Sequence, residues 1–592
     1  MNGGRADPES NSAATDGTGP SRRAALAATA GLTVSTSGCV SRLRNLVTKR
    51  NIKQLSLTVT TLPADSDRES IRIANELEQI LTTVGIDVSF DIRSGIDFNR
   101  AVLYDHEFDI CIGRHPGGTD PDFLYEALHS LYIDESGWQN PFGYTNLAVD
   151  DLLEKQRHAD GNDRRDAVTS ALEAIARDQP FVPICIPEEH RVVRTDRFTG
   201  WADGHLATRS GYLGLEPAAG VRTLRAAHTD SRPTKNLNPL ASDYRGRGTI
   251  TQLLYDSLAT DDPTGEVQPW LAESWEWHGA TLDVRLRNGC AFHDGEPVTA
   301  ADVEFTYQFL ADMSGDDDDR VVPAPRFRGQ IDAVEAIDVR SRDRLEFTVD
   351  AGQAVGERAL LVPILPAHIW RERSESPMGL GGGALSQGTT TAVVTNNIRP
   401  VGSGPYQYVN RTEGDQLRLE RFDGHFTLRS GSEQPAPTVD ECVIEVPPNP
   451  ETAIDAVGNG TADVTSTALD TRLIETVDKT DGQQRLESPS WTFYFLGFNT
   501  RKAPFGNPRF RRVIAQLIDK EWLAETVFHG YARPVATPVT EQWVPDSLTW
   551  NGQDPETPFL GTDGEVNVRA ARAAFEDAGF RYDDRDRLRI RQ

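Results

Sequence analysis

Apolar and polar positions alternate in two ways along the first part of the chain. Leu55 to Thr60 and Val88 to Ile92 alternate with the period of a strand, whereas Arg68 to Val84 carries apolar residues at helical spacing. Asp150 to Asp178 then predicts two helices, and Phe181 to Val193 predicts strands. Repeated strand–helix–strand patterning predicts an α/β lobe.

The pattern changes over residues 202–221, where glycine, alanine and turn-forming residues predict a join between two parts of the fold. From 222 to 592 the pattern is again mixed α and β. Two runs, Asp316–Asp319 and Gly379–Gly383, interrupt this second part. The glycine run neither follows a predicted strand nor opens a predicted helix, which disfavours a phosphate-binding loop.

Length and charge narrow the class of protein. The chain has 592 residues, which predicts two or three domains with a large buried core. Its formal net charge is −28, and only seven of its 61 basic residues are lysine. Such a surface suits a protein kept soluble in high salt, and ordinary acidity is the alternative interpretation. In either case nucleic-acid binding is disfavoured, because it needs basic patches.

The N-terminus carries an export pattern. Ser21 to Leu26 resembles a twin-arginine motif, and the apolar run that follows to Val34 is too short and weak to span a bilayer. Thr36 to Cys39 resembles a lipobox, which predicts lipidation of Cys39, although the usual leucine three positions before the cysteine is absent. The alternative is an unstructured start with an incidental arginine pair and cysteine.

The remaining side chains give no sign of an enzyme. Four cysteines, Cys111, Cys185, Cys290 and Cys442, show no metal-ligand spacing, so we expect buried, unpaired thiols. A disulfide between two of them is the alternative in an exported protein. The twelve histidines are scattered, and HExxH, GxSxG and Walker lysine motifs are absent from the sequence. We therefore expect no catalytic residues, no metal site and no cofactor.

Motifs in the second part resemble the opening of solute-binding protein family 5, the peptide/nickel ABC-transporter substrate-binding proteins. The most diagnostic run, Leu286–Gly289 through Phe292–Val303, is similar to the family pattern LRdGvkFhDGeplTAeDV. Other similar segments are Leu224–Ala227, Leu237–Pro239, Leu253–Leu258, Trp270–Trp275, Gly402–Tyr406, Phe498–Thr500, Pro504–Phe505, Arg509–Arg511 and Ala570–Phe580.

A second set of motifs, near the N-terminus, resembles the final third of the same family. It comprises Phe108–Gly113, Asp120–Leu124, Gly143–Asn146, Val149–Leu153, Pro183–Ile184 and Phe198–Trp201. The part that comes last in the family comes first here, which predicts a circularly permuted chain, since domain termini often lie close together. An accident of gene order that gives a mispacked chain is the competing explanation.

The resemblance implies an α/β fold of two lobes, of the periplasmic-binding-protein type II-like class, with an extra subdomain and circularly permuted. Rejoining the ends would recreate a hairpin, so Arg587–Ile590 is expected to pair antiparallel with Leu55–Val59. The implied divisions are 1–53 for export signal and tether, 54–190 for the lobe that usually ends the chain, 191–221 for the hinge return and join, 222–490 for the other lobe with its subdomain, and 491–592 for the hinge crossing and the start of the second lobe.

In function, the resemblance implies a receptor that captures peptides or related polar organic solutes and delivers them to ABC permease subunits. It would be a monomer, lipid-anchored at the extracytoplasmic face of the membrane after twin-arginine export. A sensor without a transport role and a binding-incompetent remnant of gene rearrangement are the alternatives.

The resemblance also places candidate ligand-binding residues. In peptide-binding relatives an aspartate close to a cleft tryptophan holds the ligand ammonium; the matching positions here are Gly117 and Arg114. Arg114 is therefore expected to meet an anionic ligand group, unless it is a surface arginine. The other candidates, each of which could equally belong to the core, are Tyr244, Arg245, Ser403, Tyr406, Trp491, Tyr494 and Asn499.

Overall fold

A computed structural model describes residues 52–241, 248–262, 264–313, 323–374, 392, 395–477 and 482–591. The chain divides into two compact units, and Gln54–Ile590 forms the larger one, which holds all the features that follow. The smaller unit consists of Met1–Lys53 and Arg591–Gln592, and β1 (Ile52–Gln54) begins in it.

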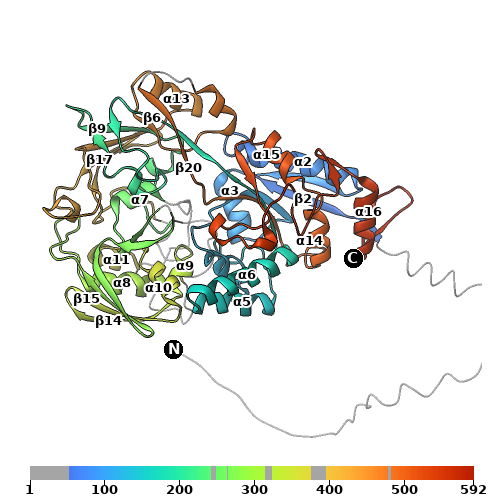
Figure 1. The fold of residues 1–592 in the computed structure, drawn as a ribbon, viewed down its shortest axis with the longest axis horizontal. Helices are drawn as coiled ribbons and strands as arrows, with labels where there is room; N and C mark the ends of the chain where they lie inside the picture. The colour runs from blue at the N-terminus through green and yellow to red at the C-terminus, as the bar shows by residue number, and fades with distance from the viewer. Residues whose placement is uncertain are drawn as a thin grey trace, which may run out of the picture. The chain divides into compact units, whose positions relative to one another are not determined.

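The first large sheet has six strands in the order β22-β5-β21-β4-β2-β3. We call residues 54–187 and 493–590, which contain this sheet, lobe A; they are blue to cyan and red in Figure 1. β2 pairs in parallel with β3 and β4, and β21 pairs antiparallel with β4 and β5. The bounds are β2 (Ser56–Thr61), β3 (Asp87–Ile92), β4 (Ile110–His115), β5 (Phe181–Pro187), β21 (Phe493–Phe498) and β22 (Ala532–Pro534).

The central strands of this sheet are buried on both faces, which explains their nearly continuous apolar runs, whereas the edge strand β3 is mostly exposed. Along β21, Tyr494, Leu496 and Phe498 join one core cluster, whereas Phe493 and Phe495 join the cluster on the other face. Helices supply the facing surfaces: α2 (Arg68–Thr83), α3 (Gly95–Asn99), η1 (Arg100–Tyr104), α4 (Phe123–Leu128), η2 (Ser130–Tyr132), α5 (Leu147–His158), α6 (Gly161–Asp178), α14 (Pro508–Ala515), α15 (Lys520–Thr526), η8 (Glu541–Trp543), η9 (Asp546–Leu548) and α16 (Val568–Asp577).

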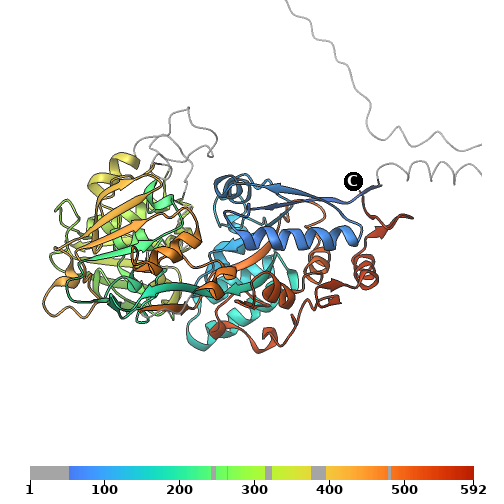
Figure 2. The same ribbon diagram turned by 90° about the horizontal axis from the view of Figure 1, so that it is seen from above.

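The second large sheet has seven strands in the order β16-β17-β18-β9-β19-β6-β20. We call residues 189–488, which contain it, lobe B; they run from green to orange in Figure 2. The strands are β6 (Glu189–Arg194), β9 (Thr223–Ala227), β16 (Tyr406–Thr412), β17 (Gln416–Arg421), β18 (Glu441–Glu445), β19 (Val464–Thr465) and β20 (Gln483–Ser488). The accompanying short elements are η3 (Arg209–Gly211), η4 (Arg232–Thr234), α7 (Thr249–Leu254), η6 (Phe426–Leu428), α13 (Pro450–Gly458) and η7 (Thr471–Thr476).

Lobe B also contains a smaller antiparallel sheet of four strands in the order β12-β13-β15-β14. Its strands are β12 (Ala272–His278), β13 (Thr281–Leu286), β14 (Val334–Ser341) and β15 (Arg344–Val349), with helices α8 (Ala300–Ala311), α9 (Arg328–Ile331), α10 (Gln353–Ala359) and α11 (Ala367–Ser374). One core cluster includes residues of both lobe B sheets, for example Phe347 and Leu419. The smaller sheet is therefore part of the same lobe.

Short strand pairs complete the fold. They are β7 (Phe198–Thr199) with β8 (Glu216–Pro217), β10 (Ala259–Asp261) with β11 (Val267–Pro269), β23 (Gly561–Thr562) with β24 (Glu565–Val566), and β25 (Arg581–Tyr582) with β26 (Leu588–Arg591).

The chain passes between the two lobes along neighbouring strands. β5 leads through Glu188 directly into β6, and β20 leads through residues 489–492 into β21. β6 and β20 pair antiparallel in lobe B, and β5 and β21 pair antiparallel in lobe A. Figure 1 shows β6 and β20 side by side where the two colour ranges meet.

The two ends of lobe A meet as the rejoined hairpin requires, but over a shorter stretch than predicted. The Leu55 N–H donates to the Leu588 carbonyl at 2.8 Å. The predicted pairing of Arg587–Ile590 with the rest of Leu55–Val59 is wrong, because β2 already uses both of its edges to pair with β3 and β4. A strand has only two hydrogen-bonding edges.

The mixed α/β class is confirmed by these sheets and helices. Cys111, Cys185, Cys290 and Cys442 are buried and unpaired, as expected from their apolar surroundings. In the part of the chain that the structure describes, the helices are all too short or too polar to pass through a bilayer.

Candidate ligand cavity

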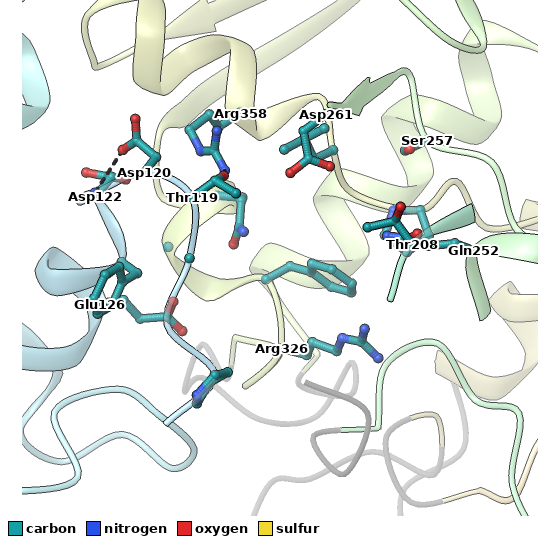
Figure 3. A pocket seen from close by; sticks show the side chains of 18 of the residues that line it. Thr119, Asp120, Asp122, Glu126, Thr208, Gln252, Ser257, Asp261, Arg326 and Arg358 are labelled. Atoms are coloured by element: carbon teal, nitrogen blue, oxygen red, sulfur yellow. Dashed lines mark hydrogen bonds between the residues drawn. The ribbon is translucent and has the colours of Figure 1, made fainter. Parts of the chain in front are cut away.

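A cavity of about 250 Å³ is lined by both lobes. Figure 3 shows Thr119, Asp120 and Glu126 on the lobe A side, across from side chains of lobe B that include Asp261 and Arg358. Lobe A contributes residues 116–120, 122, 123 and 126; lobe B contributes 208, 209, 251, 252, 255, 257, 261, 326, 327, 329, 330, 355, 358, 361 and 363.

The loop that follows β4 forms the lobe A wall. His115, the last residue of β4, is buried between aromatic rings, and its Nδ1 accepts a hydrogen bond from the Gly117 N–H at 2.9 Å. The Asp122 N–H donates to Asp120 Oδ1 at 2.9 Å, and α4 begins at the next residue. These local bonds turn the chain directly from strand to helix along the cavity.

The lobe A carboxylates at the cavity are already paired. Arg164 donates two hydrogen bonds to Asp120, at 2.6 and 2.9 Å, and Asp122 accepts from Arg157 at 3.1 Å and Gln156 at 2.8 Å. Burial alone would raise the pKa of Asp120, but the nearby Arg358 and Arg164 guanidinium groups hold it below its usual range. Asp120 therefore stays ionised, and both acids are held in the wall by their arginine partners.

The lobe B wall is built on a buried ion pair. Arg209 donates to Asp256 at 3.1 Å and to the Ser257 hydroxyl at 2.9 Å, and its guanidinium lies 4.8 Å from the ring centre of Trp270. Burial lowers the pKa of Arg209. Within the described part of the chain, its buried Nε–H has no hydrogen-bond acceptor. Arg209, which lines the cavity, thus keeps one buried donor without an acceptor.

The Asp256 carboxylate holds this arginine in place. It also accepts from the Trp270 indole N–H at 2.7 Å and lies 3.3 Å from His425 Nε2. Burial would raise the pKa of Asp256, but His425, Arg209 and Trp270 together hold it below its usual range. The carboxylate stays charged because several donors face it.

Two further charged groups of lobe B line the cavity. Arg358 spans the lobes, donating to the Thr119 hydroxyl of lobe A at 3.0 Å and to the Gly265 carbonyl at 3.1 Å. Asp261, at the end of β10, is partly exposed, and its carboxylate makes no hydrogen bond or salt bridge in the described part of the chain. The cavity therefore offers charged groups of both signs to a solute.

Arg114 and Tyr494 lie together but outside the residues that line the cavity. The Arg114 guanidinium lies 5.5 Å from the Tyr494 ring centre and 4.0 Å from an Asp67 carboxylate oxygen. The Tyr494 hydroxyl donates to Asp67 at 3.1 Å. Arg114 thus already has a carboxyl group of the protein beside it, and it lies outside the lining of this cavity.

Gly117 lines the cavity, and Trp491 lies directly behind it. Gly117 has a φ of +58°, and a Cβ there would lie 2.0 Å from the Trp491 carbonyl oxygen. Trp491 is buried, with its ring 4.4 Å from that of His205. Position 117 therefore has no room for a side chain unless the backbone shifts.

Ser403, Tyr406 and Asn499 are buried away from the cavity. Asn499 Nδ2 donates to the carbonyls of His106 and Phe108, at 2.8 and 3.0 Å, so it fixes a loop of lobe A. Tyr406 belongs to the lobe B core, and its hydroxyl and that of Ser403 have no hydrogen-bond partner in the described part of the chain. Tyr244, Arg245, Cys39, Asp316–Asp319 and Gly379–Gly383 lie outside the described residues.

Sequence reasoning missed Arg209, Asp261 and Arg358. Arg209 lies in the segment 202–221, which was predicted to be only a join, and η3 within it starts at this arginine. Asp256 lies inside the motif Leu253–Leu258, which was the available signal for this wall. Asp261 and Arg358 lie in segments without a recognised motif, and only the fold brings both of them to the cavity wall.

The family model for bacterial extracellular solute-binding proteins, family 5 Middle, matches residues 266–591. Protein XP55 of Streptomyces lividans is 25% identical over 49% of this chain and 48% of its own length. The oligopeptide-binding protein AppA of Bacillus subtilis is 23% identical, over 58% of this chain and 57% of its own. The chain thus spans about half the length of the curated relatives it matches.

Among solved structures, NikZ from Campylobacter jejuni in complex with Ni(L-His) is similar with a TM-score of 0.44 and 16% identity, over 62% of this chain and 65% of that chain. The match to family 5, which covers more than half of the chain, together with the mixed sheets, confirms the predicted family and its two-lobe, type II-like fold class.

Replacing Gly117 with alanine tests the contact that closes the cavity loop. Gly220→Ala provides the matched control, because Gly220 has a φ of +83° but open space around its Cβ position. The control should lose about 1–2 kcal/mol from the left-handed backbone alone. Gly117→Ala should lose about 3 kcal/mol or more, since the Trp491 backbone must also move. Denaturant unfolding measures both, and equal losses would contradict the contact.

Proposed function

The chain belongs to the family 5 extracellular solute-binding proteins, and we propose that it is the substrate-binding lipoprotein of an ABC importer. In this role it captures peptides or related polar organic solutes between lobes A and B and delivers them to membrane permease subunits. It acts as a binding protein, without bond-making chemistry. The observation that carries the proposal is the cavity lined by residues of both lobes.

The lining supports a polar solute that carries charge. The Arg209 Nε–H has no acceptor, and the Asp261 carboxylate makes no hydrogen bond or salt bridge, among the described residues. A buried unpaired donor costs free energy, which a ligand oxygen would recover. Asp120 and Asp122 of lobe A already pair with arginine, so Asp261 is better placed than either of them to hold a cationic ligand group.

The order of the chain supports a circular permutation. Motifs of the family's final third precede those of its opening, and the family match ends at residue 591. The Leu55 N–H to Leu588 carbonyl bond supports a rejoined end and start. We place the natural order of the family as 222–591 followed by 54–221.

Export and anchoring complete the proposal. Twin arginines at Arg22 and Arg23 would direct the folded protein out of the cell, and lipidation of Cys39 would hold it at the extracytoplasmic face of the membrane as a monomer. A lipid chain alone binds membranes weakly, so the anchor would depend on the full lipoprotein modification.

A thermal-shift screen of peptides, sugars and metal chelates tests solute capture. A true ligand should raise the melting temperature by mass action, and stabilisation reaches about 2.7 kcal/mol at 100 times its Kd. Asp261→Asn should weaken a hit that carries an ammonium group about 10-fold, because a hydrogen bond to a charged group is lost.

The matched control for this screen is Asp151→Asn, an exposed carboxylate on α5 outside the cavity, which should leave the affinity unchanged. If no solute shifts the melt, the sensor or the binding-incompetent remnant becomes the better interpretation. If hits bind with equal affinity to both variants, Asp261 does not contact them.

A reordered chain tests the permutation. Residues 222–591, a short glycine–serine linker and residues 52–221 are expected to fold as stably as residues 52–592 in their present order. The expected difference in free energy of unfolding is within about 1 kcal/mol, since loop-closure cost changes slowly with length. An insoluble reordered chain, or one that unfolds without a cooperative transition, would speak against the permutation.

Cys39→Ser tests the anchor. The variant should appear in the medium, because it loses the only site for the lipid, whereas the unchanged protein should stay with the membrane fraction. Fractionation followed by immunoblotting measures the distribution, and Cys290→Ser controls for the loss of a thiol. A variant that remains membrane-bound rules out this anchor.

A further inference from the structure

The strands that connect the lobes also carry a cluster of possible metal ligands. In the antiparallel pairing of β6 with β20, Glu487 stands directly opposite His190. Glu188 precedes His190 by two residues, so its side chain leaves the strand on the same side. The cluster, Glu188 with His190 and Glu487, thus occupies one face of a two-stranded ribbon.

The three ligand atoms are close enough for one ion. One donor atom from each residue lies within 4.8 Å of the other two, and His190 Nε2 is 3.0 Å from a Glu188 carboxylate oxygen. The imidazole is 1% exposed and its ring is held 5.2 Å from that of Tyr531. The two carboxylates are exposed. The cluster therefore combines one fixed nitrogen ligand with two reachable oxygen ligands.

The two carboxylates of this cluster have no strongly basic salt-bridge partner among the described residues. Neither Glu188 nor Glu487 forms a salt bridge with an arginine or lysine in the described part of the chain, whereas the adjacent Glu189 pairs with Arg191 at 2.7 Å. Two carboxylates held this close repel each other. The backbone pairing nevertheless keeps them together, and a bound cation would remove that repulsion.

We propose that Glu188, His190 and Glu487 form a site for a divalent transition-metal ion of the zinc class, on the strands that join the two lobes. One imidazole and two carboxylates suit zinc and its neighbours, whereas calcium and magnesium prefer all-oxygen sites. Solvent would fill the remaining coordination position on the exposed side. None of the three residues lines the solute cavity, so the site is separate from it and does not rest on the proposed function.

An ion at this site would tie the two crossing segments together. Glu188 is the residue between β5 and β6, and Glu487 lies near the end of β20, just before the return to lobe A. A cation that bridges them stabilises the folded chain by mass action. Zinc should therefore raise the melting temperature of the intact protein.

Calorimetric titration of the full-length, untagged protein with zinc chloride tests the proposal. We expect one zinc per chain, with an affinity that falls at least about 10-fold in Glu188→Gln and in Glu487→Gln, since even an outer-shell change can cost that much. Both glutamates are exposed and keep their size as glutamine, so these variants should fold normally. The rise in melting temperature with zinc should shrink in the same two variants.

Two controls make the result specific. Glu276→Gln removes an exposed carboxylate from β12 in the other sheet of lobe B and should leave zinc binding unchanged. His368→Ala removes a histidine that pairs with a carboxylate elsewhere in lobe B, 2.8 Å from Asp294, and should also leave zinc binding unchanged. The proposal is overturned if the unchanged protein takes up no zinc, or if both glutamine variants bind it as tightly as the unchanged protein.

Discussion

The arrangement of this protein depends on two crossings of the chain between its large sheets, which run next to each other. β5 and β21 are hydrogen-bonded partners in lobe A, and their continuations β6 and β20 are partners in lobe B. Backbone bonds between the crossings therefore fix how the loops at the ends of the strands face each other. Gly117 lies against Trp491 within one crossing, so the cavity loop is positioned by it.

Arginine carries most of the buried electrostatics around the cavity. Arg164 and Arg209 each donate to more than one acceptor at once, and the planar fork of the guanidinium fixes the directions of these bonds. The fixed pairs hold both walls in place, because separating a buried charge from its partner is costly. In the proposed function, recognition would fall to groups whose hydrogen bonds are incomplete among the described residues, such as the Arg209 Nε–H and Asp261.

The sequence predicted local elements well and the site less well. The alternation over Leu55–Thr60 and the helical spacing over Arg68–Val84 became β2 and α2. The first residues of β2 alternate between exposed and buried, and α2 buries one face, so each leaves a clear period. Gly117 was placed at the cavity from its motif. The sequence could not show that Tyr406 and Asn499 are buried residues and not residues of a ligand cleft. A buried polar side chain that supports a loop, as Asn499 does, looks the same in a sequence as one that contacts a ligand.

The crossings also explain why a change of chain order could leave such a receptor intact. In this chain both crossings, at Glu188 and at residues 489–492, are continuous, and the proposed joints fall elsewhere, near residues 54 and 590 and within 202–221. Moving a chain end between surface positions that are already neighbours changes the loop entropy but not the contacts of the native state. A permutation that cut either crossing would instead free one lobe to move and would separate Gly117 from Trp491. The physical requirement is therefore continuity of the two crossings, whatever order the segments follow in the gene.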